Sequence, residues 1–335
     1  MSVRRDPNSS ERGAALVAAL LLVALMAAIA VQLTDLTRFA VFRTSNTQTR
    51  ADAYWYALGA RELAEDVVLQ TVGPDVMRSD LPWLGEAQVF PIEDGLIIGA
   101  VRDGNNCLNL NALNGARGDE AEPGSSSTQA DRVRGMYREL MDQIEAPPGL
   151  ANRLQSQIID WIDADTRPES GGAEDDIYQR YSPPYRAANQ PMVELEELLA
   201  LPDMTPQLYA ILRPWLCVRP VQIQPAINVN TLSIDQAPLL VAALQGRISR
   251  PDAEALLFRR PPQGYDAVED FWAEPIIAQL ELESDELQGI GVTSQWFEMD
   301  LQVRLRETRF ELSQLVQLRD GGAVNRYRQR FGPAS

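Results

Sequence analysis

The sequence lacks histidine, and because lysine is also absent, all 30 of its basic residues are arginine. Without imidazole the chain cannot build a Ser-His-Asp triad, a Cys-His pair or a histidine-ligated zinc or iron site. Its two cysteines are also too few for a four-thiolate metal site. We interpret the missing lysine as a bias of genome composition, with no functional meaning. The missing histidine, in contrast, excludes several classes of catalytic site.

Positive charge is scarce as well. The chain carries 47 acidic against 30 basic residues, a formal net charge of −17 at pH 7. An anionic chain is repelled by phosphate backbones and by anionic lipid surfaces. We therefore expect no nucleic-acid partner.

One long apolar run lies near the N-terminus. Ala14–Leu33 has no charged residue and a single polar side chain, Gln32. At about 1.5 Å per residue, a helix over this run spans the roughly 30 Å hydrocarbon layer of a membrane. Because three arginines precede the run, we expect the leader to stay in the cytoplasm and the rest of the chain to be exported.

Three interpretations of this run remain open. It is a secretory signal peptide cleaved near Ala28-Ile29-Ala30, a plain membrane anchor, or a segment that is retained after processing at the glycine before it. The residues that follow favour retention. Between Ala14 and Thr71 there is no proline and only one glycine, and helical spacing continues with Tyr56, Ala60, Leu63 and Val67 on one stripe. This pattern predicts one long helix that ends before Gly73-Pro74 and packs beside other subunits of its kind.

This N-terminus resembles that of a type IV pilin-like prepilin, cleaved after Gly13 so that Ala14 becomes the methylated first residue. In that family the fifth mature residue is usually glutamate, whereas here it is Ala18. A lone carboxylate in lipid costs several kcal/mol unless it is paired. Because it lacks this glutamate, the chain resembles the minor pseudopilin K family of type II secretion systems, whose members lack it too.

The two cysteines, Cys107 and Cys217, form an even pair in a chain expected to be exported. Such a pair indicates one disulfide. The alternative is two buried free thiols.

Beyond the long helix, strand patterns predict a hairpin of Ala87–Ile92 and Leu96–Arg102 around Glu93-Asp94-Gly95. A flexible loop, Gly115–Gln129, follows. Strand patterns return at the C-terminus, in Trp296–Arg306, Thr308–Leu318 and Val324–Phe331. Helical patterns fill the middle: Ala130–Ile144, Pro147–Asp163, Met192–Leu201, Pro206–Leu216, Ser233–Leu244, Arg250–Arg259 and, more weakly, Asp270–Ala278 and Asp285–Leu287.

We therefore expect an α+β protein in which a small helix-and-sheet domain is interrupted by a large inserted α-helical domain. This arrangement resembles the pilin-like fold of the same family, through the segments 107–113, 172–176, 184–191 and 227–231. The expected division is a prepilin leader at 1–13, a transmembrane and amphipathic helix at 14–72, a pilin-like β domain at 73–112 and 292–335, and the inserted domain at 113–291.

The densest acidic cluster runs from Asp160 to Asp176. Gly171-Gly172 allows the chain to fold back there, and hard oxygen ligands in a flexible loop favour Ca²⁺. The alternative is a solvated acidic loop paired with Arg167 and Arg180. Because the resembled family binds calcium in its helical domain, the resemblance implies a Ca²⁺ site at Asp163, Asp165, Glu174, Asp175 and Asp176, with Asp160 and Asn189 as weaker candidates.

Two other functions remain as alternatives. Ile227–Arg260 resembles a helix-hairpin-helix module that binds DNA backbones, but its Gln245-Gly246-Arg247-Ile248 turn has a single glycine and little positive charge. The acidic cluster could instead hold the metal of a membrane-anchored periplasmic hydrolase. The sequence shows neither a nucleophile motif nor a phosphate-binding loop.

The resemblance thus implies a subunit that is not an enzyme. It would enter the inner membrane with its N-terminus in the cytoplasm, be processed by prepilin peptidase, and keep its globular part in the periplasm. There it would cap the secretion pseudopilus with minor pseudopilins I and J and, through them, join minor pseudopilin H and the major pseudopilin G.

Overall fold

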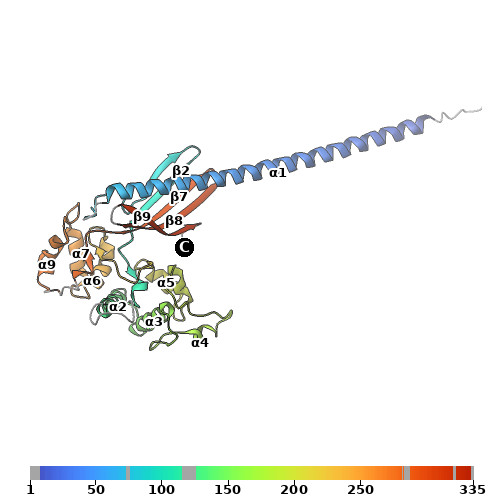
Figure 1. Cartoon of the computed structure of the whole chain (residues 1–335). Helices are drawn as coiled ribbons and strands as arrows, with labels where there is room; N and C mark the ends of the chain where they lie inside the picture. Colours follow the sequence, from blue (N-terminus) through green and yellow to red (C-terminus); the bar gives the residue numbers. More distant parts are fainter. Residues whose placement is uncertain are drawn as a thin grey trace, which may run out of the picture.

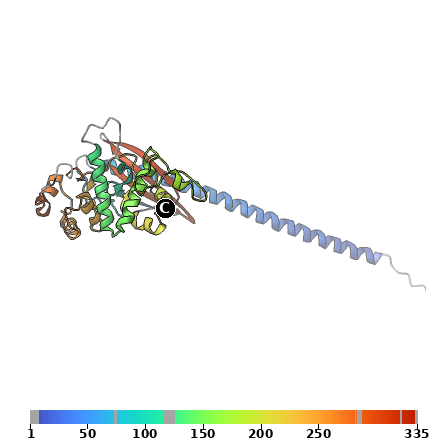
Figure 2. The same ribbon diagram turned by 90° about the horizontal axis from the view of Figure 1, so that it is seen from below.

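A computed structural model describes 8–72, 76–114, 126–280, 282, 287–319 and 322–332, with the backbone alone described at 8–12, 126–128 and 148. Its longest element is the 64-residue helix α1 (Asn8–Thr71), whose N-terminal half projects from the globular part as a straight rod (Figures 1 and 2). The helix starts before the expected Ala14 because no proline interrupts 8–13. It ends at Thr71 as predicted, although Gly73-Pro74 lies outside the described residues.

The C-terminal half of α1 packs on a sheet. The side chains buried against the sheet include Ala53, Ala57 and Val68. These small or β-branched residues let the helix approach the strands closely. The predicted stripe lies beside this face. Ala60 and Val67 pack partly against the apolar clusters, whereas Tyr56 is 37% and Leu63 is 53% exposed.

The sheet has five antiparallel strands in the order β1-β2-β7-β8-β9. The predicted hairpin at Glu93-Asp94 is present, and Gly95 is needed because a Cβ there would overlap the carbonyl oxygen of Arg304. Helix α1 crosses β2, β7 and β8 on one face (Figure 1). The strands are β1 (Gln88–Ile92), β2 (Gly95–Asp103), β7 (Trp296–Leu305), β8 (Thr308–Arg319) and β9 (Ala323–Phe331).

The chain leaves the sheet after β2 and re-enters it at β7, and buried polar side chains join these two points. Ser294 Oγ donates a 2.5 Å hydrogen bond to Asp103 Oδ2. Asn105 Oδ1 accepts from the backbone N–H groups of Gln295 and Trp296 at 3.2 and 3.1 Å. The whole stretch 104–295 is therefore one excursion from the sheet, with both ends held at one place. The expected domain boundaries at 112 and 292 remain predictions.

The excursion is mainly helical and has its own core, separate from the two apolar clusters between α1 and the sheet. Its helices gather away from the projecting half of α1 (Figure 1). They are α2 (Ser126–Gln143), α3 (Pro148–Ile162), α4 (Asp175–Tyr178), α5 (Pro206–Leu212), α6 (Ala237–Ala243), α7 (Arg250–Arg259), α8 (Val268–Trp272) and α9 (Pro275–Ala278), with the 3₁₀ turns η1 (Leu110–Ala112), η2 (Leu195–Ala200) and η3 (Ile234–Gln236).

Several expected elements differ from the observed ones. Met192–Leu201 forms only the 3₁₀ turn η2, and Asp270–Ala278 is split into α8 and α9 because Pro275 cannot continue the first helix. Four short strands, which form two parallel pairs inside the excursion, were not predicted. The expected helix Asp285–Leu287 lies mostly outside the described residues, as does much of the loop expected at Gly115–Gln129. The short strands are β3 (Leu108–Asn109) paired with β4 (Leu216–Cys217), and β5 (Ile227–Asn228) paired with β6 (Ile290–Gly291).

The overall class nevertheless agrees with expectation: the fold is α+β, with a long N-terminal helix, an antiparallel sheet and a helical excursion. A disulfide joins Cys107 to Cys217 beside the β3–β4 pair. It links the start of the excursion to a point 110 residues further along the chain.

Candidate metal centre

Three of the five expected ligand residues come together at the C-terminal end of α3. Asp163 follows directly after the helix in an extended conformation, and Glu174 precedes α4. Carboxylate oxygens of Asp163, Asp165 and Glu174 all lie within 4.8 Å of one another. The site thus takes its ligands from two short segments that the intervening loop brings side by side.

The loop folds back at Gly171-Gly172, as the sequence predicted. Gly171 has a φ of 85°, and a Cβ on Gly172 would overlap the carboxylate of Asp160. Asp160 Oδ1 accepts a 2.9 Å hydrogen bond from the backbone N–H of Glu169, which holds the returning chain against α3. The glycine pair therefore lets the second acidic segment reach the first.

Glu174 is the most perturbed carboxyl group of this cluster. Its side chain is 3% exposed, and neither of its oxygens has a hydrogen-bond partner among the described residues. Burial, together with the nearby carboxylates of Asp160, Asp163 and Asp165, raises the pKa of Glu174 from 4.5 to about 7. Burial also raises the pKa of Asp160, against two backbone hydrogen bonds that lower it. Arg167 Nε lies 3.9 Å from Asp165 Oδ1 at the exposed side of the cluster. The buried carboxylates of Asp160, Asp163 and Glu174 still repel one another, and a bound cation would relieve that repulsion.

The chemistry of these donors fits a hard divalent cation. Every candidate side-chain donor is a carboxylate or amide oxygen, and the segment is a loop, which suits the irregular coordination of Ca²⁺ better than the strict octahedron of Mg²⁺. Asn189 adds an amide: its Nδ2 donates to the carbonyl of Asp165 at 3.2 Å, and its Oδ1 has no hydrogen-bond partner in the described part of the chain. Asp160 Oδ2 is likewise buried without one.

The structure places the other two expected ligands outside this group of three. Asp176 is 64% exposed and pairs with Arg180 at 3.1 Å. Asp175 Oδ1 accepts a 3.1 Å hydrogen bond from the backbone N–H of Ala187. For Asp176, the sequence-based alternative of a solvated acidic residue paired with arginine describes the observed arrangement.

One residue near the cluster was not among the candidates. The hydroxyl group of Tyr178 is buried and has no hydrogen-bond partner among the residues described. Burial raises the pKa of Tyr178, with further contributions from Tyr185, Asp160 and Glu174. Nothing in the sequence pattern distinguishes this tyrosine from its neighbours, because only the fold turns it towards the carboxylates.

In the segment that resembles a helix-hairpin-helix module, the turn packs against α2 on one side. Its turn residue Gln245 donates through Nε2 to the carbonyl of Arg132 in α2, at 3.1 Å. A Cβ on Gly246 would overlap the carboxylate of Glu139, also in α2. The turn thus packs against α2, and a DNA backbone could not approach it from that side.

The predicted processing site lies in the projecting half of α1, where Gly13 and Ala14 are exposed. A Cβ on Gly13 would meet no atom within 4 Å. The stretch Gly13–Thr71 includes a segment that is long and apolar enough to cross a membrane, and none of that segment is buried in the structure.

A long helix that is apolar in its free half and packs on an antiparallel sheet in its other half defines a pilin-like subunit with a single membrane anchor. In this chain the large helical excursion lies between strands β2 and β7 of that sheet.

Two family models match the excursion, both described as type II secretion system protein K. The first covers 106–221 and the second 227–293. Similar curated proteins carry the same description. Type II secretion system protein K of Pectobacterium carotovorum subsp. carotovorum is 32% identical over 97% of this chain and 98% of its own length, and that of Aeromonas hydrophila is 33% identical over 93% and 97%.

A solved structure shares the fold. It is a chain in the crystal structure of the GspK-GspI-GspJ complex from the enterotoxigenic Escherichia coli type 2 secretion system. That chain matches with a TM-score of 0.73 and 26% identity, over 87% of this chain and 100% of its own length. The chain belongs to the type II secretion system protein K family. It is a minor pseudopilin, and the comparisons give no support to the hydrolase or DNA-binding alternatives.

Proposed function

We propose that this pseudopilin caps the tip of the periplasmic pseudopilus together with minor pseudopilins I and J, and so initiates assembly for protein export across the outer membrane. The observation that carries the proposal is the match to the GspK-GspI-GspJ complex over 87% of the chain. The large size of the excursion is a second argument for a position at the tip. A subunit with a large extra domain would clash in a closely packed helical stack, whereas an end position leaves room for it.

The position of α1 extends the proposal. The helix enters the inner membrane with its N-terminus in the cytoplasm, because three arginines precede the apolar run. Prepilin peptidase cleaves after Gly13 and Ala14 is methylated. With Ala18 in place of the usual glutamate, this subunit has no carboxylate in the bilayer. It therefore needs no further subunit whose terminal amine would pair with such a carboxylate. Subunits I and J then link it to H and to the major pseudopilin G.

No catalytic step belongs to this proposal. The buried acidic cluster has no histidine beside it, since the chain has none. We assign the cluster a structural role.

A labelling experiment on assembled fibres tests the tip position. The full chain carrying a small C-terminal epitope replaces the native subunit, and gold-conjugated antibody marks its location along each fibre. We expect one label at a single end, whereas label on the major pseudopilin should be spread along the length. Even spacing of this chain along the fibre contradicts the capping role.

We also propose that Asp163, Asp165 and Glu174 bind Ca²⁺, with the oxygens of Asp160 and Asn189 close enough to assist. Support comes from the group of three carboxylates within 4.8 Å, from the raised pKa of Glu174, and from its two buried oxygens. The bound ion would offset the mutual repulsion of the buried carboxylates in this cluster. It would also tie the end of α3 to the segment that leads into α4.

Calorimetric titration of the metal-free full chain in detergent tests this site. We expect Ca²⁺ to bind and to raise the melting temperature, and a chelator to reverse the rise. Glu174→Gln should remove most of this response because it deletes a buried ligand charge. The matched control is Asp176→Asn, which changes an exposed carboxylate only two residues away and should leave binding intact. Equal loss in both variants, or no binding by the wild type, contradicts the assignment.

A further inference from the structure

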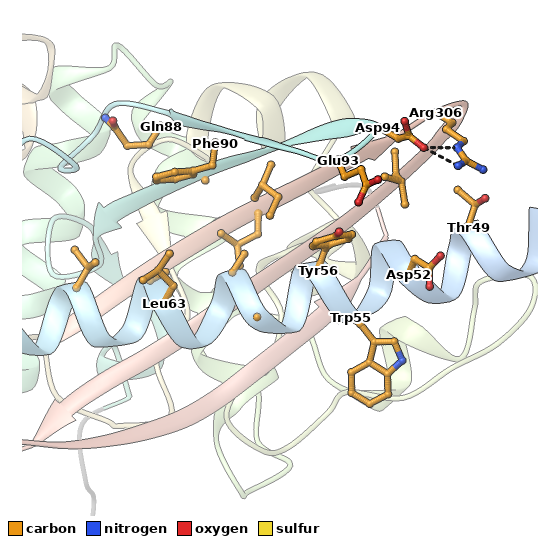
Figure 3. Close-up of a pocket in the computed structure, with 18 of the residues that line it drawn as sticks. Thr49, Asp52, Trp55, Tyr56, Leu63, Gln88, Phe90, Glu93, Asp94 and Arg306 are labelled. Atoms are coloured by element: carbon orange, nitrogen blue, oxygen red, sulfur yellow. Dashed lines mark hydrogen bonds and ion pairs between the residues drawn. The ribbon is translucent and has the colours of Figure 1, made fainter.

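A polar cleft of about 650 Å³ separates the excursion from the face of the sheet that α1 leaves open. Side chains alternate between the two faces of a strand. On β7, Met299 therefore packs in the apolar cluster under α1, while Glu298 and Asp300 line the cleft. Helix α5 borders the cleft and lies on the side of the sheet opposite α1 (Figure 1). A separate groove, bordered by Tyr56 and Leu63, lies on the α1 face (Figure 3).

One part of the cleft wall joins the excursion firmly to the sheet. Arg219, which belongs to the excursion, is 1% exposed and donates to the carbonyl of Gly104 at 2.6 Å and to Glu298 at 3.0 Å. Its Nη2 also lies 3.4 Å from the sulfur of Cys107, and both cysteines of the disulfide line the cleft. Together with the bonds of Asn105 described above, these contacts form a junction about which the excursion can turn.

The cleft is also bridged by charged side chains from its two walls. Glu194 of the excursion pairs with Arg328 at 3.2 Å and with Arg330 at 3.5 Å, and Glu196 pairs with Arg330 at 3.3 Å. We call these four residues the latch. Their side chains are 25–39% exposed, and ion pairs open to solvent are individually weak and are screened by salt. The latch can therefore separate without unfolding either wall of the cleft.

A bulge in β9 directs the arginines of the latch towards the excursion. In a regular strand Arg326 and Arg328 would share a face of the sheet. The pairing of β8 with β9 shifts by one residue at Tyr327, and such a bulge turns the side chains on its two sides to opposite faces. Arg326 accordingly pairs with Glu65 of α1 at 2.7 Å, whereas Arg328 pairs with Glu194. The last strand thus holds α1 on one face and the excursion on the other.

The acidic half of the latch is connected to the metal centre through η2. Glu197 accepts a 3.0 Å hydrogen bond from Trp161 in the last turn of α3, and a second one of 3.0 Å from the backbone N–H of Glu194. Asn189, a few residues before Glu194, donates to the carbonyl of Asp165 at 3.2 Å. A change in the position of the metal-binding loop is therefore transmitted to the segment that carries the latch glutamates.

We propose that the excursion is hinged at its junction with the sheet and that the latch holds the cleft closed while the metal centre is occupied. When the ion is lost, η2 loses its fixed position, the ion pairs separate and the cleft opens. The dependence on the ion rests on the Ca²⁺ site proposed above. The latch itself rests only on the contacts between η2 and β9.

The disulfide in the cleft wall reports the opening. Cys107 and Cys217 are 8% and 5% exposed, so an open cleft admits a thiol that the closed one excludes. The full chain in detergent with Ca²⁺ is treated with dithiothreitol. One of its thiolates attacks a sulfur of the protein, and the reagent leaves as its own cyclic disulfide, with two protein thiols formed. Alkylation and mass spectrometry give the rate of reduction.

Charge reversal on either side of the latch should open the cleft. We expect Glu194→Arg and Arg328→Glu each to speed reduction by about tenfold, because access limits the attack on a buried disulfide. These two changes shift the net charge in opposite directions, so a common increase cannot come from attraction of the anionic reagent. The matched control is Glu254→Arg, which breaks a 3.0 Å pair with Arg250 inside α7 and should leave the rate unchanged.

The combined variant separates a lost latch from general damage. Glu194→Arg together with Arg328→Glu re-forms the pair with its charges exchanged, so reduction should return to within about threefold of the wild-type rate. Melting temperatures of the oxidised proteins, measured beside these rates, should agree among the variants. Fast reduction in the combined variant, or wild-type rates in both single variants, overturns the latch.

Removal of the ion tests the link to the metal centre. A chelator should speed reduction of the wild type to a similar degree and add nothing in Glu194→Arg, whose cleft is already open. If calorimetry shows that Ca²⁺ binds but the chelator leaves the wild-type rate unchanged, the link is wrong. If calorimetry shows no binding, the proposed metal site fails and the ion dependence with it, while the charge variants still decide the latch.

Discussion

At the scale of single residues, the most informative side chain is that of Glu174. A buried carboxylate beside three others is unfavourable unless it is protonated or faces a cation. The protein keeps this arrangement within a loop that its glycines fold back on itself. A cation bound in the native environment would offset the repulsion between these carboxylates, and the periplasmic side of a membrane is open to external calcium.

The raised pKa of Glu174 has a consequence for metal-free protein. Between its ordinary value of 4.5 and the native value of about 7, the folded state holds a proton that the unfolded state releases. The contribution of this group to the free energy of unfolding therefore falls as the pH rises through that window. We expect metal-free wild type to lose stability from pH 5 to pH 8 relative to Glu174→Gln, as measured by urea unfolding in chelator. Added Ca²⁺ should remove that difference in wild type at pH 8. A wild type and variant with parallel pH profiles would contradict the assigned pKa.

The sequence predicted part of this site. The spacing of the acids and the Gly171-Gly172 pair indicated that two acidic segments would meet, and Asp163, Asp165 and Glu174 do. It could not separate Glu174 from Asp175 and Asp176, because consecutive residues differ only in the direction of their side chains. That direction is set by the start of α4, a four-residue helix too short to leave a periodic pattern.

At the scale of elements, the junction between sheet and excursion depends on a few buried polar side chains. Asn105 is 5% exposed and forms hydrogen bonds with three backbone groups. Its Oδ1 accepts from the N–H groups of Gln295 and Trp296, and its Nδ2 donates to the carbonyl of Ala226. Asn105→Ala would leave these groups buried without partners. We expect a loss of about 3 kcal/mol in the free energy of unfolding. Asn46→Ala, on the exposed surface of α1, should change it by less than about 0.5 kcal/mol. Equal effects of the two changes in denaturant titration would show that the junction is held elsewhere.

The disulfide acts on the same excursion. Because Cys107 and Cys217 are 110 residues apart, their bond restricts the unfolded chain strongly. The double change Cys107→Ser with Cys217→Ser should cost about 4–5 kcal/mol in the chain-entropy account. Urea unfolding of wild type with and without reductant, beside the double variant, measures this cost. An unchanged midpoint would mean that the link adds nothing to stability.

The sequence predicted the elements that are long or strongly patterned. The helix over Arg250–Arg259 and the three C-terminal strands agree closely with α7, β7, β8 and β9. The two-residue strands β3 to β6 could not be foreseen, since so few residues carry no periodicity and their partners are distant in the chain. The stripe of Tyr56 and Leu63 was correctly placed on one helix face, but a stripe alone does not reveal what covers it.

At the scale of the whole molecule, α1 connects the membrane to the globular part without a break. Its apolar half has no partner within the described chain, and its other half offers a second face to a neighbour. Such a helix can anchor the protein and contact other subunits only if it stays attached after maturation. The retained helix is thus the central claim on which the capping role and the anchored periplasmic location depend.

Blocking the processing step tests whether the helix is handled as a prepilin. Gly13→Ala should leave an uncleaved precursor and stop secretion, because the peptidase needs the glycine that precedes the apolar run. Gly59→Ala makes the same change further along α1, again where a Cβ meets nothing, and should be processed normally. Precursor and mature forms are separated by gel mobility of the membrane fraction. Normal maturation of the Gly13 variant would refute the prepilin assignment.

The most direct measurement is mass spectrometry of the N-terminus of the mature protein from cells that carry the secretion system. The account predicts a membrane-bound chain that begins at N-methylated Ala14. A free periplasmic chain that begins at Val31, or an unprocessed chain that begins at Met1 or Ser2, would contradict it.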